Sequence, residues 1–332
     1  MSLPSSARRA AALVAGGSLF FLAACGSGST QSADPSASSS DGASAATTGK
    51  TIVFSPLGLQ IPAMKGLSEG VTGYGTSQGF EVIVQDPNLD PQKQVTDLQS
   101  VIESGKASGV WAIAVQPTSM AALVKIAQDK KVPLILNGVP EDYGLSGLVP
   151  GVSFSTIDYV AQGKAIGEEL GKCINEKLGG TAKVIMEENA PGTAGKEELE
   201  SNAKDALLAT APGAEIVTTV QVKDRAGAQT DIGAALQGNP EVRAVLGTND
   251  EGALGAVGAF AAAGKELTCV TEAGGNDEAL AAAKAGTIYA VVALQFQDDM
   301  AQSFDALVAM INDPTKTGTQ MTVPQKVIKA GS

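Results

Sequence analysis

Residues 242–255 read VRAVLGTNDEGALG, an apolar run that ends in an Asn-Asp pair and continues into small residues at helical spacing. The run 242–247 predicts a strand, and the small residues from Glu251 onward predict a helix that starts almost directly after it. A strand followed at once by a helix is the repeating unit of parallel α/β sheets.

The same alternation continues on both sides of this unit. The helix opened by Asp90 and Pro91 shows it most fully, because the aspartate can cap free amides, the proline suits the first turn and Gly105 can end the helix. We expect strands at residues 51–55, 80–85, 110–115, 132–136, 182–187, 214–222, 242–247, 267–271 and 288–294. After a connection near 150–156, we expect helices to begin near Ile157, Thr193, Gly227, Glu251 and Asp277.

Two successive sets of such units predict an α/β protein with two doubly wound parallel-sheet lobes. The chain has 332 residues, more than one hydrophobic core usually serves, and 44% of them are apolar. In open α/β sheets, ligands bind beyond the carboxyl ends of the strands. A site shared by two such lobes is therefore expected in a cleft between them.

Composition excludes several classes of function. The formal charge is -12, so the surface repels nucleic acid, and no nucleic-acid partner is predicted. Histidine is absent, which removes the commonest general base and the commonest metal ligand. We therefore predict no catalytic residue, no metal site and no cofactor.

An enzyme is still one alternative, because residues 75–79 read GTSQG and match the nucleophile elbow of serine hydrolases. That motif joins a strand to a following helix, whereas here it precedes the strand expected from Phe80. Without a histidine as base, the motif does not support catalysis. The acidic pairs Glu187-Glu188 and Glu197-Glu198 are interpreted as solvated faces.

The first residues indicate export. Arg8 and Arg9 precede an apolar run at 10–24 that is too short to span a membrane comfortably. Residues 22–25 read LAAC and resemble a bacterial lipobox, which implies a signal peptide at 1–24 and a lipid on Cys25. An ordinary signal peptide with a chance cysteine, or an uncleaved anchor, is the alternative.

Residues 25–49 consist of Cys25 followed by a tract rich in Ser, Gly, Ala and Thr. Such a tract cannot bury a core and spans about 25–30 Å as a coil. We therefore expect a tether that holds the folded part at the outer face of the cytoplasmic membrane, near a partner in that membrane.

The two remaining cysteines, Cys173 and Cys269, fall in one lobe, on a helix and at the start of a strand. In an oxidising compartment they can form a disulfide. The alternative is two small buried hydrophobic residues.

The order of elements resembles the type I periplasmic solute-binding proteins, in particular the ribose-binding branch that serves sugar ABC transporters. The resemblance extends from Lys50 to the end of the chain, and residues 242–255 are its most specific part. Supporting stretches are KVPLI at 131–135, GTAG at 192–195 and the segment 295–298.

This resemblance implies that the chain crosses between the lobes three times, through a three-strand hinge. The amino-terminal lobe would hold residues 50–152 and 296–325, and the carboxy-terminal lobe 153–295 and 326–332. It also implies a function: the lobes close around a small ligand and present it to an ABC transporter permease. The alternative is a ligand-sensing receptor module for chemotaxis or a sensor kinase.

The resemblance also suggests ligand-binding residues. Asn249 matches a family asparagine that bonds ligand hydroxyls, whereas Asp250 is interpreted as a helix cap. Gln295 matches a glutamine near the hinge, and a hydrogen bond within the crossover is its alternative role. Asn137 lies within one position of a sugar-binding aspartate of the family.

Departures from the family pattern change the expected ligand. Met64, with Leu57 and Gln60 before it, stands in the loop where relatives place aromatic rings. Other positions lose the charges or rings of the relatives; the residues at or beside them are Glu197, Arg225 and Asn276. We therefore expect a small sugar-like or partly apolar neutral metabolite.

Overall fold

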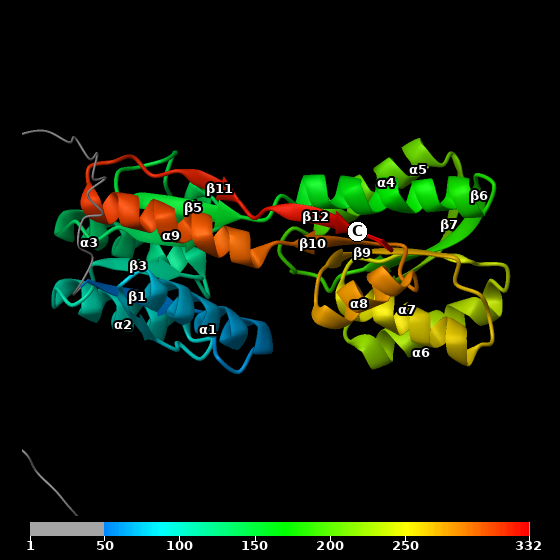
Figure 1. The fold of residues 1–332 in the computed structure, drawn as a ribbon, viewed down its shortest axis with the longest axis horizontal. Coiled ribbons are helices and arrows are strands. Elements are labelled where there is room, and N and C mark those ends of the chain that lie inside the picture. Colours follow the sequence, from blue (N-terminus) through cyan, green and yellow to red (C-terminus); the bar gives the residue numbers. More distant parts are fainter. Residues whose placement is uncertain (1–49, 332) are drawn as a thin grey trace, which may run out of the picture. The chain divides into compact units, whose positions relative to one another are not determined.

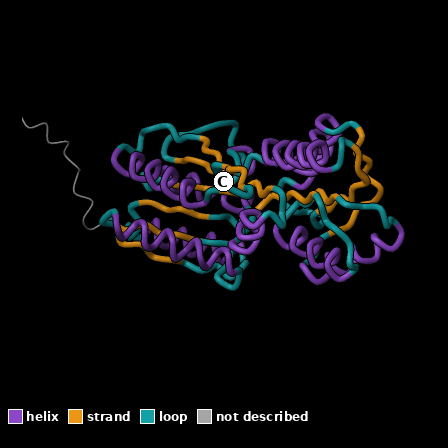
Figure 2. The backbone as a smooth tube through the Cα atoms, turned by 45° about the vertical axis from the view of Figure 1, so that its right-hand side comes forward, coloured by secondary structure: helices purple, strands orange, loops and turns teal. Residues whose placement is uncertain are grey.

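The computed structural model describes residues 50–331, which form two six-stranded sheets with helices on both faces (Figures 1 and 2). The predicted signal peptide, the lipid on Cys25 and the tether lie outside the described residues. No described helix is both long and apolar enough to cross a membrane.

The first sheet has the order β11-β5-β4-β3-β1-β2, and all its strands are parallel. Its buried faces pack against helices α2 and α3 on one side and against α1 and α9 on the other. The strands are β1 (Thr51–Ser55), β2 (Glu81–Val84), β3 (Gly109–Ala112), β4 (Leu134–Asn137), β5 (Val152–Thr156) and β11 (Gln320–Thr322). The helices are α1 (Pro62–Ser77), α2 (Pro91–Glu103), α3 (Ala121–Lys130) and α9 (Phe296–Asn312), with short 3₁₀ turns at Pro117–Met120 and Pro140–Tyr143.

The second sheet has the order β12-β10-β9-β8-β6-β7, in which only β12 is antiparallel to its neighbour. One face packs against α4 and α5, the other against α6, α7 and α8. The strands are β6 (Thr181–Glu188), β7 (Gly213–Gln221), β8 (Ala244–Leu246), β9 (Cys269–Gly274), β10 (Ala290–Leu294) and β12 (Gln325–Ile328). The helices are α4 (Tyr159–Lys177), α5 (Lys196–Thr210), α6 (Arg225–Gly238), α7 (Asp250–Ala262) and α8 (Asp277–Ala285).

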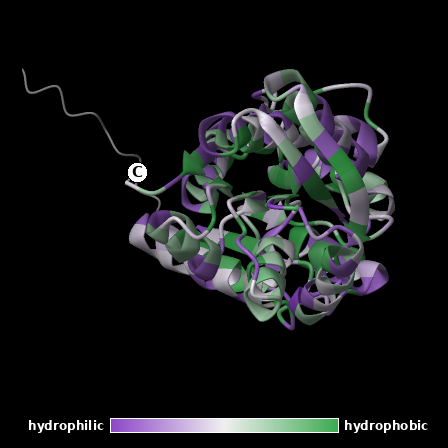
Figure 3. Cartoon of the chain, turned by 90° about the vertical axis from the view of Figure 1, so that its right-hand side faces the viewer, coloured by the Kyte–Doolittle hydropathy of each residue, from purple (hydrophilic) through white to green (hydrophobic). Residues whose placement is uncertain are grey.

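These two lobes confirm the predicted fold class. Hydrophobic and hydrophilic residues alternate along the helices, as one buried face requires (Figure 3). In α2, the side chain of Asp90 accepts hydrogen bonds from the amides of Gln92 and Lys93, so the predicted cap is present. The GTSQG stretch begins inside α1, and the Ser77 hydroxyl donates to the carbonyl of Tyr74.

One prediction was wrong at 150–156, because that segment is mostly strand β5 and not a connection. Val152 and Phe154 are fully buried, and β5 pairs with β4 on one side and with β11 on the other. The segment is short and contains three polar residues, Ser153, Ser155 and Thr156, so its alternation with apolar residues was not recognised as a strand. It is nevertheless an interior strand of the first sheet.

The chain passes from one sheet to the other three times, between β5 and α4, between β10 and α9, and between β11 and β12. Backbone hydrogen bonds join the crossovers: the Val323 amide donates to the Thr156 carbonyl, and the Gln295 amide donates to the Pro324 carbonyl, each at 2.8 Å. Helix α9 and β11 therefore belong to the first lobe although they follow the second in sequence.

Glycines bring α4 very close to α5. A Cβ atom at Gly163 would lie 2.2 Å from the Leu199 carbonyl oxygen, and one at Gly167 would lie 2.1 Å from that of Ala203. No other residue fits at these positions without moving a backbone. Glycine at two positions four residues apart on α4 therefore permits this close approach of α4 and α5.

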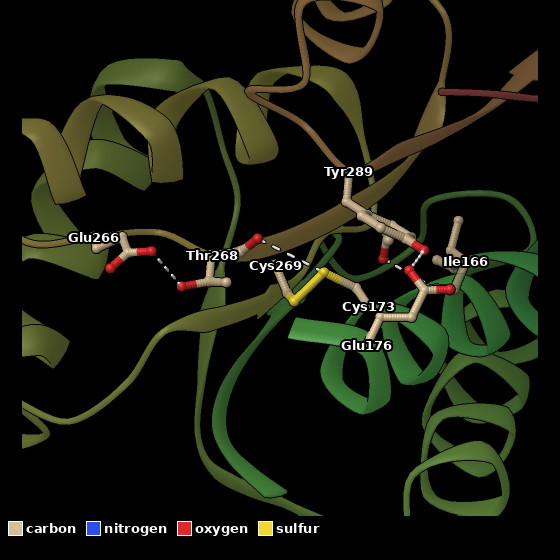
Figure 4. Close-up of a disulfide and its surroundings, with 8 residues drawn as sticks. Ile166, Cys173, Glu176, Glu266, Thr268, Cys269 and Tyr289 are labelled. Carbon is tan, nitrogen blue, oxygen red and sulfur yellow. Dashed lines mark hydrogen bonds between the residues drawn. A yellow bond between two sulfur atoms is a disulfide. The ribbon is translucent and has the colours of Figure 1, made fainter. Parts of the chain in front are cut away.

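Cys173 of α4 and Cys269 of β9 form a disulfide on the α4 side of the second sheet (Figure 4). Their Cα atoms are 5.8 Å apart and their separation in sequence is 96 residues. Beside it, the Tyr289 hydroxyl donates to Glu176 at 2.8 Å. The bridge thus links the helix and the sheet of one lobe.

Candidate functional site

Asn249 follows the carboxyl end of β8 in the second lobe, close to Asn189, which follows β6. Its Oδ1 accepts from the Gly252 amide at 2.9 Å, and its Nδ2 donates to Asn189 Oδ1 at 2.8 Å. Asn249 is therefore the N-cap of α7, and the prediction that Asp250 is the cap was wrong. Both amide groups lie beside a hollow of about 350 Å³, whose lining residues are Asn189, Ala190, Thr193, Val222, Lys223, Asn249, Asp250 and Glu251.

Asp250 stabilises a turn instead of capping α7. Its Oδ1 accepts from the amides of Gly275 at 2.8 Å and of Asn276 at 3.0 Å, so it holds the turn between β9 and α8. Asn276 in turn caps α8 by accepting from the Ala279 amide at 2.8 Å. The structure thus brings Asn249 and Asn276, both predicted for the site, to neighbouring helix starts in one lobe.

Two acids behind this surface are buried, and one of them corrects a prediction. Glu187, expected on a solvated face, is fully buried at the end of β6, and burial raises its pKa to about 8 against a weak hydrogen bond from the Thr248 amide. In the sequence, the Glu187-Glu188 pair indicated an exposed face. Because this strand is covered by helices on both faces, it has no exposed side on which Glu187 could lie. Glu272 of β9 is also fully buried.

Arg225 was predicted to contact ligand, but its charge is already matched. Its guanidinium forms a two-bond contact with Glu251, at 2.9 and 3.1 Å, and a further bond to Glu278 at 2.8 Å. Hydrogen bonds to these two carboxylates hold the pKa of Arg225 above its usual value. The network joins the starts of α6, α7 and α8. Glu197, also predicted, is exposed in the first turn of α5.

In the first lobe, Asn137 is the last residue of β4, and its side-chain oxygen accepts two hydrogen bonds. Its Oδ1 accepts from the Ala114 amide at 2.7 Å and from the Tyr143 hydroxyl at 3.1 Å. The oxygen of this predicted ligand residue is therefore already used within the lobe.

The loop after β1 carries the other predicted residues of the first lobe. Leu57 and Met64 are half-buried, and Gln60 is exposed with its amide folded back against Gly58. The Leu57 carbonyl accepts from the amide of Leu89, which has a positive φ of 62° and is exposed. The backbone of the loop after β1 is thus tied to the turn that precedes α2.

Gln295 lies in the crossover between β10 and α9. Its Nε2 donates to the Ala293 carbonyl at 3.1 Å, so in this structure the side chain takes the alternative role, a hydrogen bond within the crossover.

Sequence reasoning missed Asn189 and Gln94. Asn189 directly follows β6, so the carboxyl-end rule could have found it. Gln94 is almost fully buried, and its amide bonds Ser55, the Ile113 carbonyl and the Val115 amide. Its signal was a polar residue on the apolar face of α2. The described residues contain no group of acids or cysteines placed to hold a metal ion.

Comparison with known proteins agrees with this architecture. A family model described as a periplasmic binding protein domain matches residues 52–315. The Bacillus subtilis ribose import binding protein RbsB is 31% identical over 253 residues, covering 74% of this chain and 76% of that protein. A putative rhizopine-binding protein from Rhizobium meliloti is 32% identical over 260 residues, covering 74% and 78%.

Solved structures agree in fold. The crystal structure of a periplasmic ribose ABC transporter from Conexibacter woesei has a TM-score of 0.69 at 25% identity, covering 85% of this chain and 92% of that one. A periplasmic solute-binding protein from Actinobacillus succinogenes, solved with D-allose, has a TM-score of 0.71 at 18% identity, covering 84% and 97%. The resemblance predicted from the sequence is confirmed: the chain belongs to the periplasmic binding protein family.

Proposed function

We propose that this chain is the extracytoplasmic solute-binding lipoprotein of an ABC importer. It captures a small sugar-like or partly apolar neutral metabolite by closing its two lobes and delivers it to a permease. The lipid on Cys25 holds it at the outer face of the cytoplasmic membrane.

The observation that carries this proposal is the pair of amides, Asn249 and Asn189, beside the hollow of the second lobe. An amide can donate to and accept from the same hydroxyl-rich ligand. The apolar loop around Leu57 and Met64 offers no aromatic ring for stacking, which favours a ligand with some apolar surface. Relatives are named for binding ribose, rhizopine and xylitol, which are all small and hydroxyl-bearing.

The ligand is identified first by mass spectrometry of the molecule that remains bound through purification. Calorimetry with that molecule, and with ribose, xylitol and galactose, then ranks the class. Tight binding of ribose or galactose together with no binding of less polar compounds would contradict the expected ligand. Scattering with and without ligand tests closure, because a ligand that contacts both lobes stabilises only the closed form.

A single substitution tests the site. Asn249→Asp keeps the oxygen that caps α7 but loses the donor that reaches Asn189. We expect at least a tenfold loss of affinity, since one hydrogen bond to a ligand contributes about 1 kcal/mol and the new charge adds desolvation. Asn312→Asp is the matched control at an exposed asparagine of α9 and should leave affinity unchanged.

Equal affinity of Asn249→Asp and the wild type would overturn the proposed site. Copurification with a permease supports uptake, whereas binding to a sensor kinase without a permease would show the receptor function instead.

A further inference from the structure

Carboxyl groups occupy the spaces that glycines leave at the carboxyl end of the second sheet. A Cβ at Gly252 would lie 2.1 Å from Glu187 Oε2, and a Cβ at Gly274 would lie 2.4 Å from Asp250 Oδ2. Any side chain at these two positions would displace an acid. The acids are thus built into this end of the lobe.

Within residues 50–331, Glu272 is a buried acid without a cation or a hydrogen-bond donor to stabilise its charge. It is fully buried, and neither of its carboxylate oxygens has a hydrogen-bond partner among the described residues. Glu272 and Gly274 lie on the same face of β9, and Asp250 Oδ2 occupies the space beside Gly274, so the two carboxyl groups are neighbours. Two ionised carboxylates cannot bond to each other, because neither has a proton to donate. A proton on one of them turns the contact into a hydrogen bond.

The surrounding charges favour that proton. The pKa of Glu272 is raised well above its usual value by burial first, then by the charge of Asp250 beside it, and by the charge of Glu187. Arg225 of α6 is bound to Glu251 of α7 and Glu278 of α8, and no cation is among the groups that shift the pKa of Glu272. On the other side of the sheet, Glu169 of α4 is bound to Lys172 and Lys329.

We propose that Glu272 is a positioning residue, which carries a proton, donates it in a hydrogen bond to Asp250 and so fixes the turn that Asp250 holds. Asp250 Oδ1 accepts from the amides of Gly275 and Asn276, and Oδ2 lies beside Gly274. The proposed bond to Asp250 would therefore connect the buried Glu272 to the start of α8. That this turn belongs to the ligand surface rests on the proposed function. The chain of hydrogen bonds itself is independent of any ligand.

Amide hydrogen exchange on the ligand-free protein tests the proposal. Glu272→Gln keeps a donor at all pH values, whereas Glu272→Met keeps the size and removes the donor. We expect the protection factors of the Gly275 and Asn276 amides to stay within about threefold of wild type in Glu272→Gln and to fall at least tenfold in Glu272→Met. The Gly227 amide, bonded to Asp224 at 2.7 Å in the same lobe, is the internal control.

A spectroscopic measurement covers the case in which Glu272→Met fails to fold. Carbon-13 carboxyl spectra of glutamate-labelled protein near neutral pH should contain a protonated carboxyl signal that disappears in Glu272→Gln. Equal loss of protection in Glu272→Gln and Glu272→Met would overturn the proposal, as would a spectrum in which no protonated signal disappears. Neither result depends on ligand, so both leave the proposed function standing.

Discussion

Replacing Glu187 with glutamine should remove a pH dependence of stability that the buried acid imposes. In the folded protein the pKa of Glu187 is about 8, against 4.5 for the exposed group. The folded state therefore holds a proton that the unfolded state releases above pH 4.5. The stability linked to this group is fully present below that value and is lost as the pH rises to about 8.

The magnitude follows from the difference in pKa. Each unit corresponds to about 1.4 kcal/mol, so the contribution of Glu187 falls by about 3 kcal/mol between pH 4.5 and pH 7 and by about 5 kcal/mol at pH 8 and above. Glutamine cannot ionise, so Glu187→Gln should lose this slope while keeping nearly the same volume. Glu188→Gln, the adjacent half-buried acid, is the matched control and should keep it.

The assay is urea unfolding of the three proteins at several values from about pH 5 to pH 9. Circular dichroism reports both lobes, whereas fluorescence reports the first, since the only tryptophan, Trp111, is buried there. The difference in slope between wild type and Glu187→Gln should appear in circular dichroism and be absent from fluorescence if the lobes unfold separately. Identical slopes for wild type and Glu187→Gln would refute the reasoning.

Two further predictions concern the second lobe, and one of them has its control in α1 of the first lobe. Replacing Cys173 and Cys269 with alanine should lower the free energy of unfolding by about 4 to 5 kcal/mol, because the bridge closes a loop of 96 residues. The measurement is urea unfolding, and a free energy of unfolding equal to that of the oxidised wild type would contradict the prediction. Gly167→Ala should lower Tm by several degrees, because its Cβ would meet the Ala203 carbonyl. Gly66→Ala, with open space around it, is the control and should leave Tm unchanged or raise it. Calorimetric scans that show the same Tm for both variants would count against the close helix contact.

Much of the fold could be predicted from local patterns. The strand at 51–55 and the helix start at Asp277 are found where they were expected, because apolar runs and capping residues mark them directly. Strands β11 and β12 were not expected, since each is three or four residues long and carries few buried side chains. Their pairing depends on partners far away in sequence, and a local pattern does not contain that information.

The site was less predictable than the fold. The position of Asn249 at a strand end followed from the pattern, but its role as cap did not, because Asn249 and Asp250 are both good capping residues. The engagement of Arg225 could not be foreseen, since Glu251 and Glu278 meet it only through the packing of three helices. The burial of Glu187 could not be predicted either, because acidic pairs are usually solvated. Water is excluded from Glu187 only because helices cover the second face of the sheet as well.

The three crossovers affect the order in which the lobes can be completed during synthesis. Strand β11 and helix α9 fill the edge and the core of the first lobe, yet they emerge after almost all of the second lobe has been made. The second lobe in turn receives its edge strand from residues 325–328, close to the end of the chain. Until residues 296–312 have been made, a nascent chain therefore leaves the apolar side chains of Ile52 and Phe54 without the cover of α9, so completion of the first core waits for synthesis of the second lobe.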